Sequence, residues 1–130
     1  MIFLDANFLV SFYIEDEKYH ERALEIMEES KNKKKIISKL IIGETINILF
    51  TKLKIDKNIM KGIYESLNND YNLVDDSYIF DKTINKIMNS KKRFPFFDHV
   101  YITLMEDLEI KEIATFDKHF NNIAHITRVY

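Results

Sequence analysis

Apolar residues along this chain fall into two patterns, short continuous runs and longer stretches with helical spacing. The short runs predict strands at residues 2–4, 35–37, 71–74, 112–115 and 125–129. The longer stretches predict helices, one beginning at Ala6 and the others at residues 19–29, 39–53, 55–67, 78–88 and about 95–108. Strands that alternate with helices are typical of a parallel sheet covered by helices on both faces.

Two acidic residues stand where strands are expected to end. Asp5 directly follows the first strand, and Asp117 lies just beyond the fourth. Because ligands of parallel α/β sheets bind at the carboxyl ends of the strands, both are candidate site residues. Each also has an alternative interpretation as a helix cap or a turn residue, since Asp accepts hydrogen bonds from nearby backbone N–H groups.

Two further acids interrupt apolar helix faces. Glu44 and Asp98 each have mostly apolar residues one turn away on their own helix, so they are expected to face the core or a cleft. A buried ion pair, to Lys39 or Arg93, is one explanation, because an unpaired buried carboxylate is costly. A single site shared with the two strand-end acids explains all four residues more economically.

Composition narrows the classes of protein that fit. A chain of 130 residues with 46% hydrophobic and 31% charged residues predicts one globular domain spanning residues 1–130. The chain has only 2 Gly and 1 Pro, and so few turn-forming residues disfavour a β-sandwich. The absence of Cys excludes disulfides and thiolate zinc sites. The net charge of -2 argues against a polycationic nucleic-acid binder. No membrane-length apolar run or basic leader is present, so we expect a cytoplasmic protein without membrane contact.

Four converging carboxylates need a counter-charge, because like charges raise one another's pKa. Hard divalent cations such as Mg²⁺ or Mn²⁺ prefer carboxylate and water oxygens, whereas the scattered His residues do not favour zinc. No phosphate-binding Gly-rich loop occurs in the sequence. A carboxylate-held cation without such a loop suits phosphodiester hydrolysis.

Four short motifs follow one another along the chain. They are Phe3-Leu4-Asp5-Ala6-Asn7, a strand and Ser38 followed by Gly43-Glu44-Thr45, then Phe97-Asp98-His99, and finally Ala114-Thr115-Phe116-Asp117-Lys118-His119-Phe120. In this order, and across essentially the whole chain, they resemble the PIN-domain ribonucleases, and among these the small VapC-like toxins.

This resemblance implies a three-layer α/β/α sandwich around a parallel sheet of four to five strands, with Mg²⁺ or Mn²⁺ as cofactor. It implies a metal-dependent endoribonuclease of single-stranded or structured RNA that leaves 5′-phosphate and 3′-hydroxyl ends. The protein would be either a toxin restrained by a separate antitoxin or an RNA-processing enzyme. The catalytic and metal-binding acids carried over are Asp5, Glu44, Asp98 and Asp117, with Asn7 and Thr115 in supporting roles.

The region around the last two acids adds three expectations. Many relatives have a further acid where this chain has His119, which argues against a strong second metal site. Lys92 and Arg93 precede the helix that bears Asp98 and are candidate RNA-phosphate contacts. Tyr13, Phe94 and Phe97 could stack on bases, although we expect at least two of them in the core.

A signalling or binding module, such as a receiver-like phospho-acceptor domain, is the alternative function. Asp75 and Asp76, at the end of the third strand, favour it. A receiver, however, needs paired acids after its first strand, where only Asp5 is present. It would also leave Glu44 and Asp98 unexplained.

The helical region from residue 40 to residue 67 predicts self-association. Its apolar residues lie on more than one helix face, and Leu49, Phe50, Leu53 and Ile59 exceed what one sheet face needs. Exposed apolar patches often mark interfaces, and the toxin relatives commonly form dimers. We therefore expect a homodimer.

Overall fold

The computed structural model describes residues 1–130 and is built around a five-stranded sheet. All strands are parallel, in the order β3-β2-β1-β4-β5. They are β1 (Ile2–Leu4), β2 (Lys35–Ser38), β3 (Asn72–Val74), β4 (Glu112–Ala114) and β5 (Thr127–Val129). The apolar runs therefore predicted every strand to within two residues at each end.

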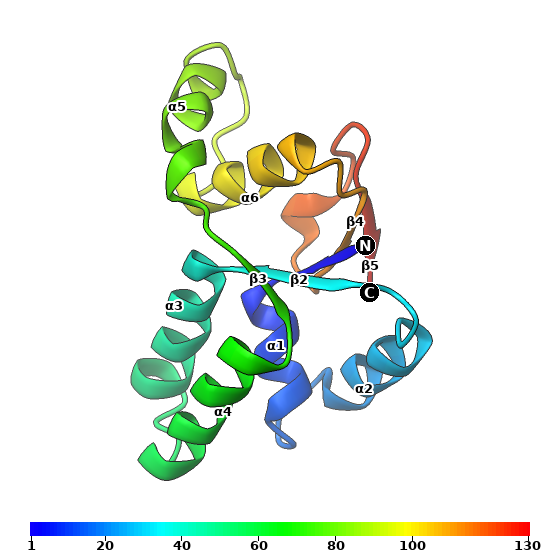
Figure 1. Cartoon of the computed structure of the whole chain (residues 1–130), viewed down its shortest axis with the longest axis vertical. Helices are drawn as coiled ribbons and strands as arrows, with labels where there is room; N and C mark the ends of the chain where they lie inside the picture. Colours follow the sequence, from blue (N-terminus) through cyan, green and yellow to red (C-terminus); the bar gives the residue numbers. More distant parts are fainter.

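Six α-helices cover the sheet. They are α1 (Ala6–Tyr13), α2 (His20–Glu29), α3 (Lys39–Asn47), α4 (Lys57–Asn69), α5 (Phe80–Met88) and α6 (Phe96–Asp107). Helices α1 to α4 lie on one side of the sheet and α5 and α6 on the other (Figure 1). Short 3₁₀ turns precede α5 (Ser77–Ile79) and follow β4 (Lys118–Phe120). The predicted three-layer α/β/α fold is confirmed.

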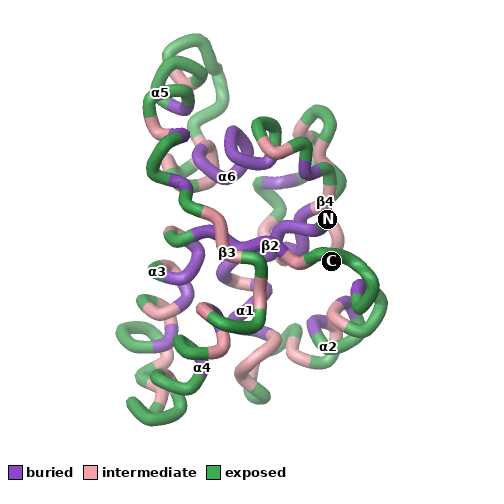
Figure 2. Tube along the Cα trace, viewed as in Figure 1, coloured by how far each residue is buried: buried purple, intermediate pink, exposed green.

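The core lies where the two helical layers meet the central strands. Every residue of β1 is at most 1% exposed, as expected for a central parallel strand with helices on both faces. Figure 2 shows the buried positions gathered in the inner strands β1, β2 and β4 and in α1 and α6, whereas α4 and α5 are largely exposed. No helix combines the length and apolar character needed to cross a bilayer.

The order of the strands reverses between β1 and β4. The chain builds β1, β2 and β3 outward in one direction and then crosses to place β4 on the other side of β1. Leu4 pairs with Ala114, and the Asp5 amide donates to the Ala114 carbonyl at 3.0 Å. The residues that follow β1 and β4 therefore emerge side by side, at the point where such sheets bind ligands.

The predicted helix over residues 39–53 is wrong in its second half. Helix α3 ends at Asn47, and Ile48–Lys52 forms a π-helical turn closed by a hydrogen bond from the Leu53 amide to the Ile48 carbonyl. The wider turn changes which side chains face inward. Leu49 is fully buried, so its assignment to an exposed apolar surface is wrong, whereas Phe50 is 51% exposed.

The start of α4 differs from the prediction because apolar spacing does not reveal where a helix is capped. Asp56 precedes the helix, and its carboxylate accepts hydrogen bonds from the backbone N–H groups of Asn58 and Ile59 at 2.9 and 3.2 Å. This cap satisfies otherwise unpaired donors of the first turn. The helix therefore begins at Lys57 rather than Ile55.

The acid pair after β3 has local structural partners. Asp75 is exposed and accepts hydrogen bonds from the backbone and side chain of Ser77. Asp76 is 2% exposed, and its Oδ2 accepts a hydrogen bond from the Leu40 amide at 3.0 Å. Asp76 thus holds the first turn of α3, the helix that carries Glu44. The structure gives both acids a role that needs no phosphorylation, and the receiver-like alternative is not favoured.

Candidate active site

Asp5 is the most buried acid of the candidate site and lies where β1 passes into α1. Thr115, directly after β4, donates to Asp5 Oδ2 at 2.7 Å. Asn7 Nδ2 donates to the same oxygen at 3.2 Å. The other oxygen, Oδ1, accepts from the Ala6 amide at 2.8 Å. Asp5 is therefore both a helix cap and part of a polar cluster, because its two oxygens serve different partners.

Asn7 and Thr115 also connect β1 to the segment that carries Asp117. Asn7 Oδ1 accepts from the Phe116 amide at 3.0 Å, and Thr115 Oγ1 accepts from the Asp117 amide at 3.1 Å. These contacts fix the chain after β4 against the start of α1. The structure thus places both predicted supporting residues in contact with Asp5 and next to Asp117.

Glu44 reaches the site from the middle of α3. Tyr101 on α6 donates to Glu44 Oε1 at 2.7 Å, which joins the two helical layers across the end of the sheet. The Tyr101 side chain is fully buried, so its hydroxyl has a fixed position. The second carboxylate oxygen of Glu44 has no hydrogen bond, which leaves it available to a ligand.

Asp98, Asp117 and His119 form the open part of the site. One ligand atom from each lies within 4.8 Å of the other two. His119 Nδ1 is 3.4 Å from Asp98 Oδ2 and 3.4 Å from Asp117 Oδ2. Asp117 also caps the following 3₁₀ turn, because its Oδ1 accepts from the His119 amide at 2.9 Å. As in Asp5, one carboxylate oxygen of Asp117 caps the turn, and the other, Oδ2, faces a side chain of the site.

The pKa values of three of these acids are raised, mainly by burial and in part by the negative charges of their neighbours. Burial raises the pKa of Asp5 to about 7, and the charges of Asp98 and Glu44 add to the rise. Burial also raises the pKa of Glu44, with a contribution from Asp98, and the pKa of Asp98, with a contribution from Asp117. Hydrogen bonds to the carboxylates oppose these shifts without cancelling them.

No Lys or Arg neutralises this cluster. Glu44 has no ion-pair partner, and Asp98 pairs only with His119. The suggested ion pairs of Glu44 or Asp98 with Lys39 or Arg93 are therefore absent. Several carboxylates with raised pKa values and one imidazole are a donor set that fits a divalent cation.

Lys92 and Arg93 lie beside this cluster and touch none of its acids. Both are exposed in the connection between α5 and α6, and both line a cavity of about 460 Å³ that also borders His99 on α6. Lys92 Nζ lies 5.7 Å from the centre of the Phe94 ring. Their position at the entrance to α6 leaves them free to meet a substrate.

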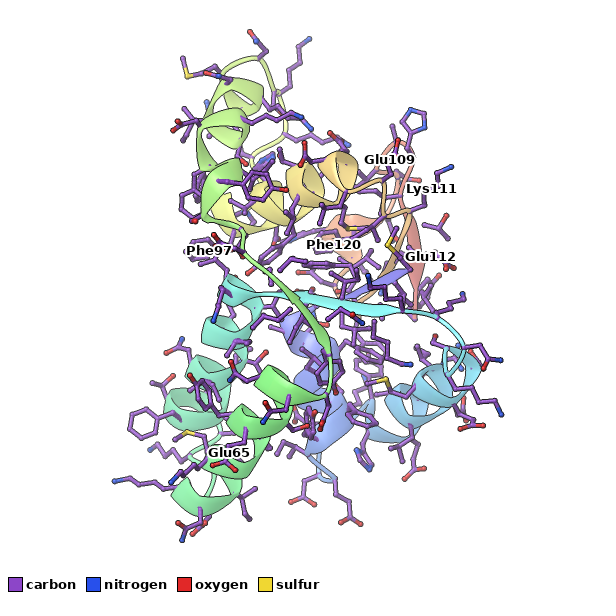
Figure 3. The ribbon with its side chains drawn as sticks, viewed as in Figure 1. Glu65, Phe97, Glu109, Lys111, Glu112 and Phe120 are labelled. Carbon is purple, nitrogen blue, oxygen red and sulfur yellow. The ribbon has the colours of Figure 1, made fainter.

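The largest cavity lies away from these acids. It has a volume of about 610 Å³ and is lined by residues such as Glu109, Lys111 and His125, between the end of α6 and the starts of β4 and β5. Figure 3 shows Glu109 and Lys111 at the opposite end of α6 from Phe97. Since α6 brings Asp98 to the site through its first turn, this cavity is not part of the acid cluster.

Three residues that shape the site, His119, Tyr101 and Asp76, are not predicted as site residues by the sequence. The sequence patterns indicate His119 only as the absence of an acid and Asp76 only as half of a receiver-like pair, and they assign no role to Tyr101. A polar hydroxyl three residues after Asp98 on the same helix face was the signal for Tyr101. For His119 and Asp76 the decisive contacts come from other elements of the fold.

Comparison with known proteins agrees with this architecture. The PIN domain family matches residues 2–126. Among solved structures, Mycobacterium tuberculosis VapC20, a sarcin–ricin loop cleaving toxin, is similar with a TM-score of 0.79 and 16% sequence identity over 92% of each chain. No curated protein matches the sequence significantly. The likeness to VapC20 shows a common fold, and the family match, which spans nearly the whole chain, shows that this protein belongs to the PIN domain family.

Proposed function

We propose that this protein is a metal-dependent endoribonuclease and the toxin of a toxin–antitoxin pair. The observation that carries the proposal is the group of Asp98, Asp117 and His119, with ligand atoms within 4.8 Å of one another, beside buried Asp5 at the ends of β1 and β4. Membership of the PIN domain family supports a nuclease. RNA as substrate is supported by the similarity to VapC20, which cleaves the sarcin–ricin loop.

The residues of the site have three roles: positioning the carboxylates, binding the cation and binding RNA phosphates. Thr115 and Asn7 fix the direction of the Asp5 carboxylate, and Tyr101 fixes that of Glu44. Asp5, Glu44, Asp98 and Asp117 hold the cation. When bound, a divalent cation supplies positive charge that stabilises the attacking and leaving oxygens of phosphodiester hydrolysis. Outside the acid cluster, Lys92 and Arg93 bind phosphates of the RNA.

Mg²⁺ or Mn²⁺ is the cation that best suits these donors. Both ions prefer carboxylate oxygens and retain bound water. The imidazole of His119 adds a nitrogen donor, which Mn²⁺ accepts more readily than Mg²⁺ does. We therefore propose that either ion supports activity and that Mn²⁺ binds more tightly.

Cleavage of a generic single-stranded RNA tests the nuclease. We expect cleavage with Mg²⁺ or Mn²⁺, none with excess chelator, and products that carry 5′-phosphates. Glu44→Gln keeps an acceptor for the Tyr101 hydroxyl but removes the charge, so it should abolish cleavage and leave the fold intact. Glu65→Gln, an exposed acid on α4 (Figure 3), is the matched control. Wild-type rates in Glu44→Gln would contradict the proposed site.

Expression in a bacterial host tests the toxin role. Induction of the wild-type protein should arrest growth and deplete intact RNA, whereas Glu44→Gln should be tolerated. Co-expression of the protein encoded in the adjacent reading frame should restore growth if it is the antitoxin. Unimpaired growth together with strong nuclease activity in vitro would favour an RNA-processing enzyme over a toxin.

A homodimer completes the proposal. Phe50, Ile59 and Tyr64 are 51%, 58% and 48% exposed along the π-helical turn and α4, and large exposed apolar side chains favour association. Light scattering at micromolar concentration should give twice the mass of one chain. Phe50→Glu with Ile59→Glu should return the protein to a monomer, and a wild-type monomer would contradict the dimer.

A further inference from the structure

Three aromatic rings meet beside the acid cluster. Phe94 lies at the end of the connection from α5 to α6, with its ring centre 5.3 Å from that of His99 and 5.8 Å from that of His119. The Phe94 and His119 planes differ by 24°, and the Phe94 and His99 planes by 34°. The Phe94 ring is thus stacked on that of His119 and tilted against that of His99. Together the three rings form one aromatic surface, which joins the connection before α6, the first turn of α6 and the 3₁₀ turn after β4.

This aromatic surface starts at the acids themselves. The Nδ1 edge of His119 faces Asp98 and Asp117 at 3.4 Å, while the ring face meets Phe94. His99 follows Asp98 directly on α6. A group stacked on these rings would therefore be a close neighbour of whatever the carboxylates hold.

The rings remain accessible. Phe94 and His99 are half-buried, and the His119 side chain is 51% exposed. An aromatic cluster that served only to pack the connection against α6 would be expected to bury its rings, as Phe120 is buried at 1% exposure. These three rings instead keep contact with solvent.

A positively charged cavity adjoins the rings. Its volume is about 460 Å³, and its walls include Phe94, His99, Lys92 and Arg93 and no acidic residue. Lys92 Nζ lies 5.7 Å from the centre of the Phe94 ring. Aromatic faces combined with Lys and Arg are the features by which proteins bind single-stranded nucleic acid, because every base has a flat face and every phosphate a negative charge.

We propose that Phe94, with His99 and His119, forms a stacking site for a nucleobase of single-stranded RNA that neighbours the scissile phosphate. Lys92 and Arg93 bind the phosphates that flank this base. The inference rests on the proposed nuclease function and specifies its substrate as RNA with an unpaired base at this position. Duplex RNA does not fit the site, because its bases are stacked on one another and are not free to stack on protein.

Binding of short RNA oligomers to full-length protein tests the stacking site separately from catalysis. The probe is a fluorescein-labelled single-stranded oligouridylate, and the comparison probe has the same backbone with abasic positions. All proteins carry Asp5→Asn so that the RNA stays intact, and binding is followed by fluorescence anisotropy. Melting temperatures verify that each variant is folded.

The variants separate stacking from packing. Phe94→Ala should weaken binding of the base-containing RNA roughly tenfold and leave binding of the abasic RNA unchanged. Phe94→Tyr keeps the flat face and should bind normally, whereas Phe94→Leu keeps apolar bulk without that face and should behave as Phe94→Ala. Phe97→Ala removes an exposed ring that does not line the cavity and is the matched control.

Each outcome decides one proposal. Equal affinities of Phe94→Ala and Phe97→Ala, or an equal loss on base-containing and abasic RNA, would overturn the stacking site. Metal-dependent cleavage by the protein without Asp5→Asn would still support the nuclease. A base-dependent loss in Phe94→Ala, combined with no cleavage by the unmodified protein, would keep the stacking site and overturn the nuclease.

Discussion

The acid site has an inner and an outer half, and the two are built differently. The inner half, Asp5 with Asn7 and Thr115, is held by hydrogen bonds of 2.7 to 3.2 Å, and Asp5 is 5% exposed. The outer half, Asp98 with Asp117 and His119, is joined by longer contacts of 3.4 Å. Its side chains are 14%, 32% and 51% exposed.

This difference follows from what positions each half. Asp5 and Thr115 directly follow two adjacent strands whose register is set by the sheet, and Asn7 lies in the first turn of α1. Backbone pairing therefore fixes the relative positions of Asp5 and Thr115. The outer residues sit in the first turn of α6 and in the 3₁₀ turn after β4. The side-chain contact of His119 with Asp98 joins these two turns. We infer that the inner half keeps its geometry whether or not an ion is bound, and that the outer half, whose ligand atoms lie within 4.8 Å of one another, adjusts to the ion and the substrate.

The largest expected effect comes from neutralising the inner half. Asp5→Asn should abolish metal-dependent RNA cleavage, because it removes a buried carboxylate while keeping the shape and the cap on Ala6. In chelator the variant should melt at or above the wild-type temperature, since the mutual repulsion of the acids is reduced. Added Mg²⁺ or Mn²⁺ should raise the melting temperature of the wild type much more than that of the variant.

Asp56→Asn is the matched control for this substitution. Asp56 caps α4 as Asp5 caps α1 but is not among the acids of the site. This variant should keep full activity and the wild-type response to metal. An Asp5→Asn protein that behaves in the same way would reduce Asp5 to a helix cap and contradict the carboxylate site.

The pH dependence of the free energy of unfolding tests the environment of Asp5 in the wild-type protein. The pKa of Asp5 is raised to about 7 from its ordinary value of 3.8, so between these values the folded state binds more protons than the unfolded state. In chelator, Asp5 should therefore lower the free energy of unfolding as pH rises from about 4 to about 7, by up to about 1.4 kcal/mol per pH unit. Urea unfolding at several pH values measures the slope, which should be shallower in Asp5→Asn. Parallel profiles for the two proteins would contradict a raised pKa at Asp5.

The position of the inner half is also the part of the site that the sequence predicts best. Periodicity predicted the strands and the crossover helices, and alternation of the two predicted a parallel sheet. From this, Asp5 and the residues after β4 could be placed at the ends of strands, because that position depends only on where each strand stops. The catalytic and metal-binding roles of these residues stay predictions.

The outer half could not be derived in the same way. The contact of His119 with Asp98 depends on how the 3₁₀ turn after β4 packs against α6, and spacing along one element does not reveal contacts between elements. The same holds for the hydrogen bond from the Leu40 amide to Asp76 across two elements. Leu49 was misplaced because apolar periodicity assumes a regular α-helix, whereas the chain widens into a π-helical turn there.

Replacing His119 in the outer half tests whether its side chain sets the preference of the site for Mg²⁺ or Mn²⁺. His119→Asp replaces a nitrogen donor by a carboxylate and should favour Mg²⁺, because Mg²⁺ prefers oxygen ligands. We expect the ratio of the Mg²⁺ to the Mn²⁺ dissociation constant to fall by about tenfold, as measured by titration calorimetry. His125→Asp makes the same change at the far end of the sheet, next to the largest cavity, and should leave the ratio unchanged. An unchanged ratio in His119→Asp would place the imidazole outside the ion's coordination.

The smallest expected effect lies beyond the outer half, at the cations that border it. Replacing Lys92 and Arg93 together by Ala should weaken binding of RNA and raise KM more than it lowers kcat, because phosphate contacts position the substrate and take no part in the chemistry. Each lost contact should reduce the slope of log Kd against log salt by about one unit. Unlike Phe94→Ala, this double variant should weaken the binding of base-containing and abasic RNA alike.

Lys57→Ala with Lys61→Ala removes two exposed charges from α4 and controls for net charge. If both double variants change the salt slope equally, general charge attracts the RNA and no specific phosphate contact exists beside Asp98.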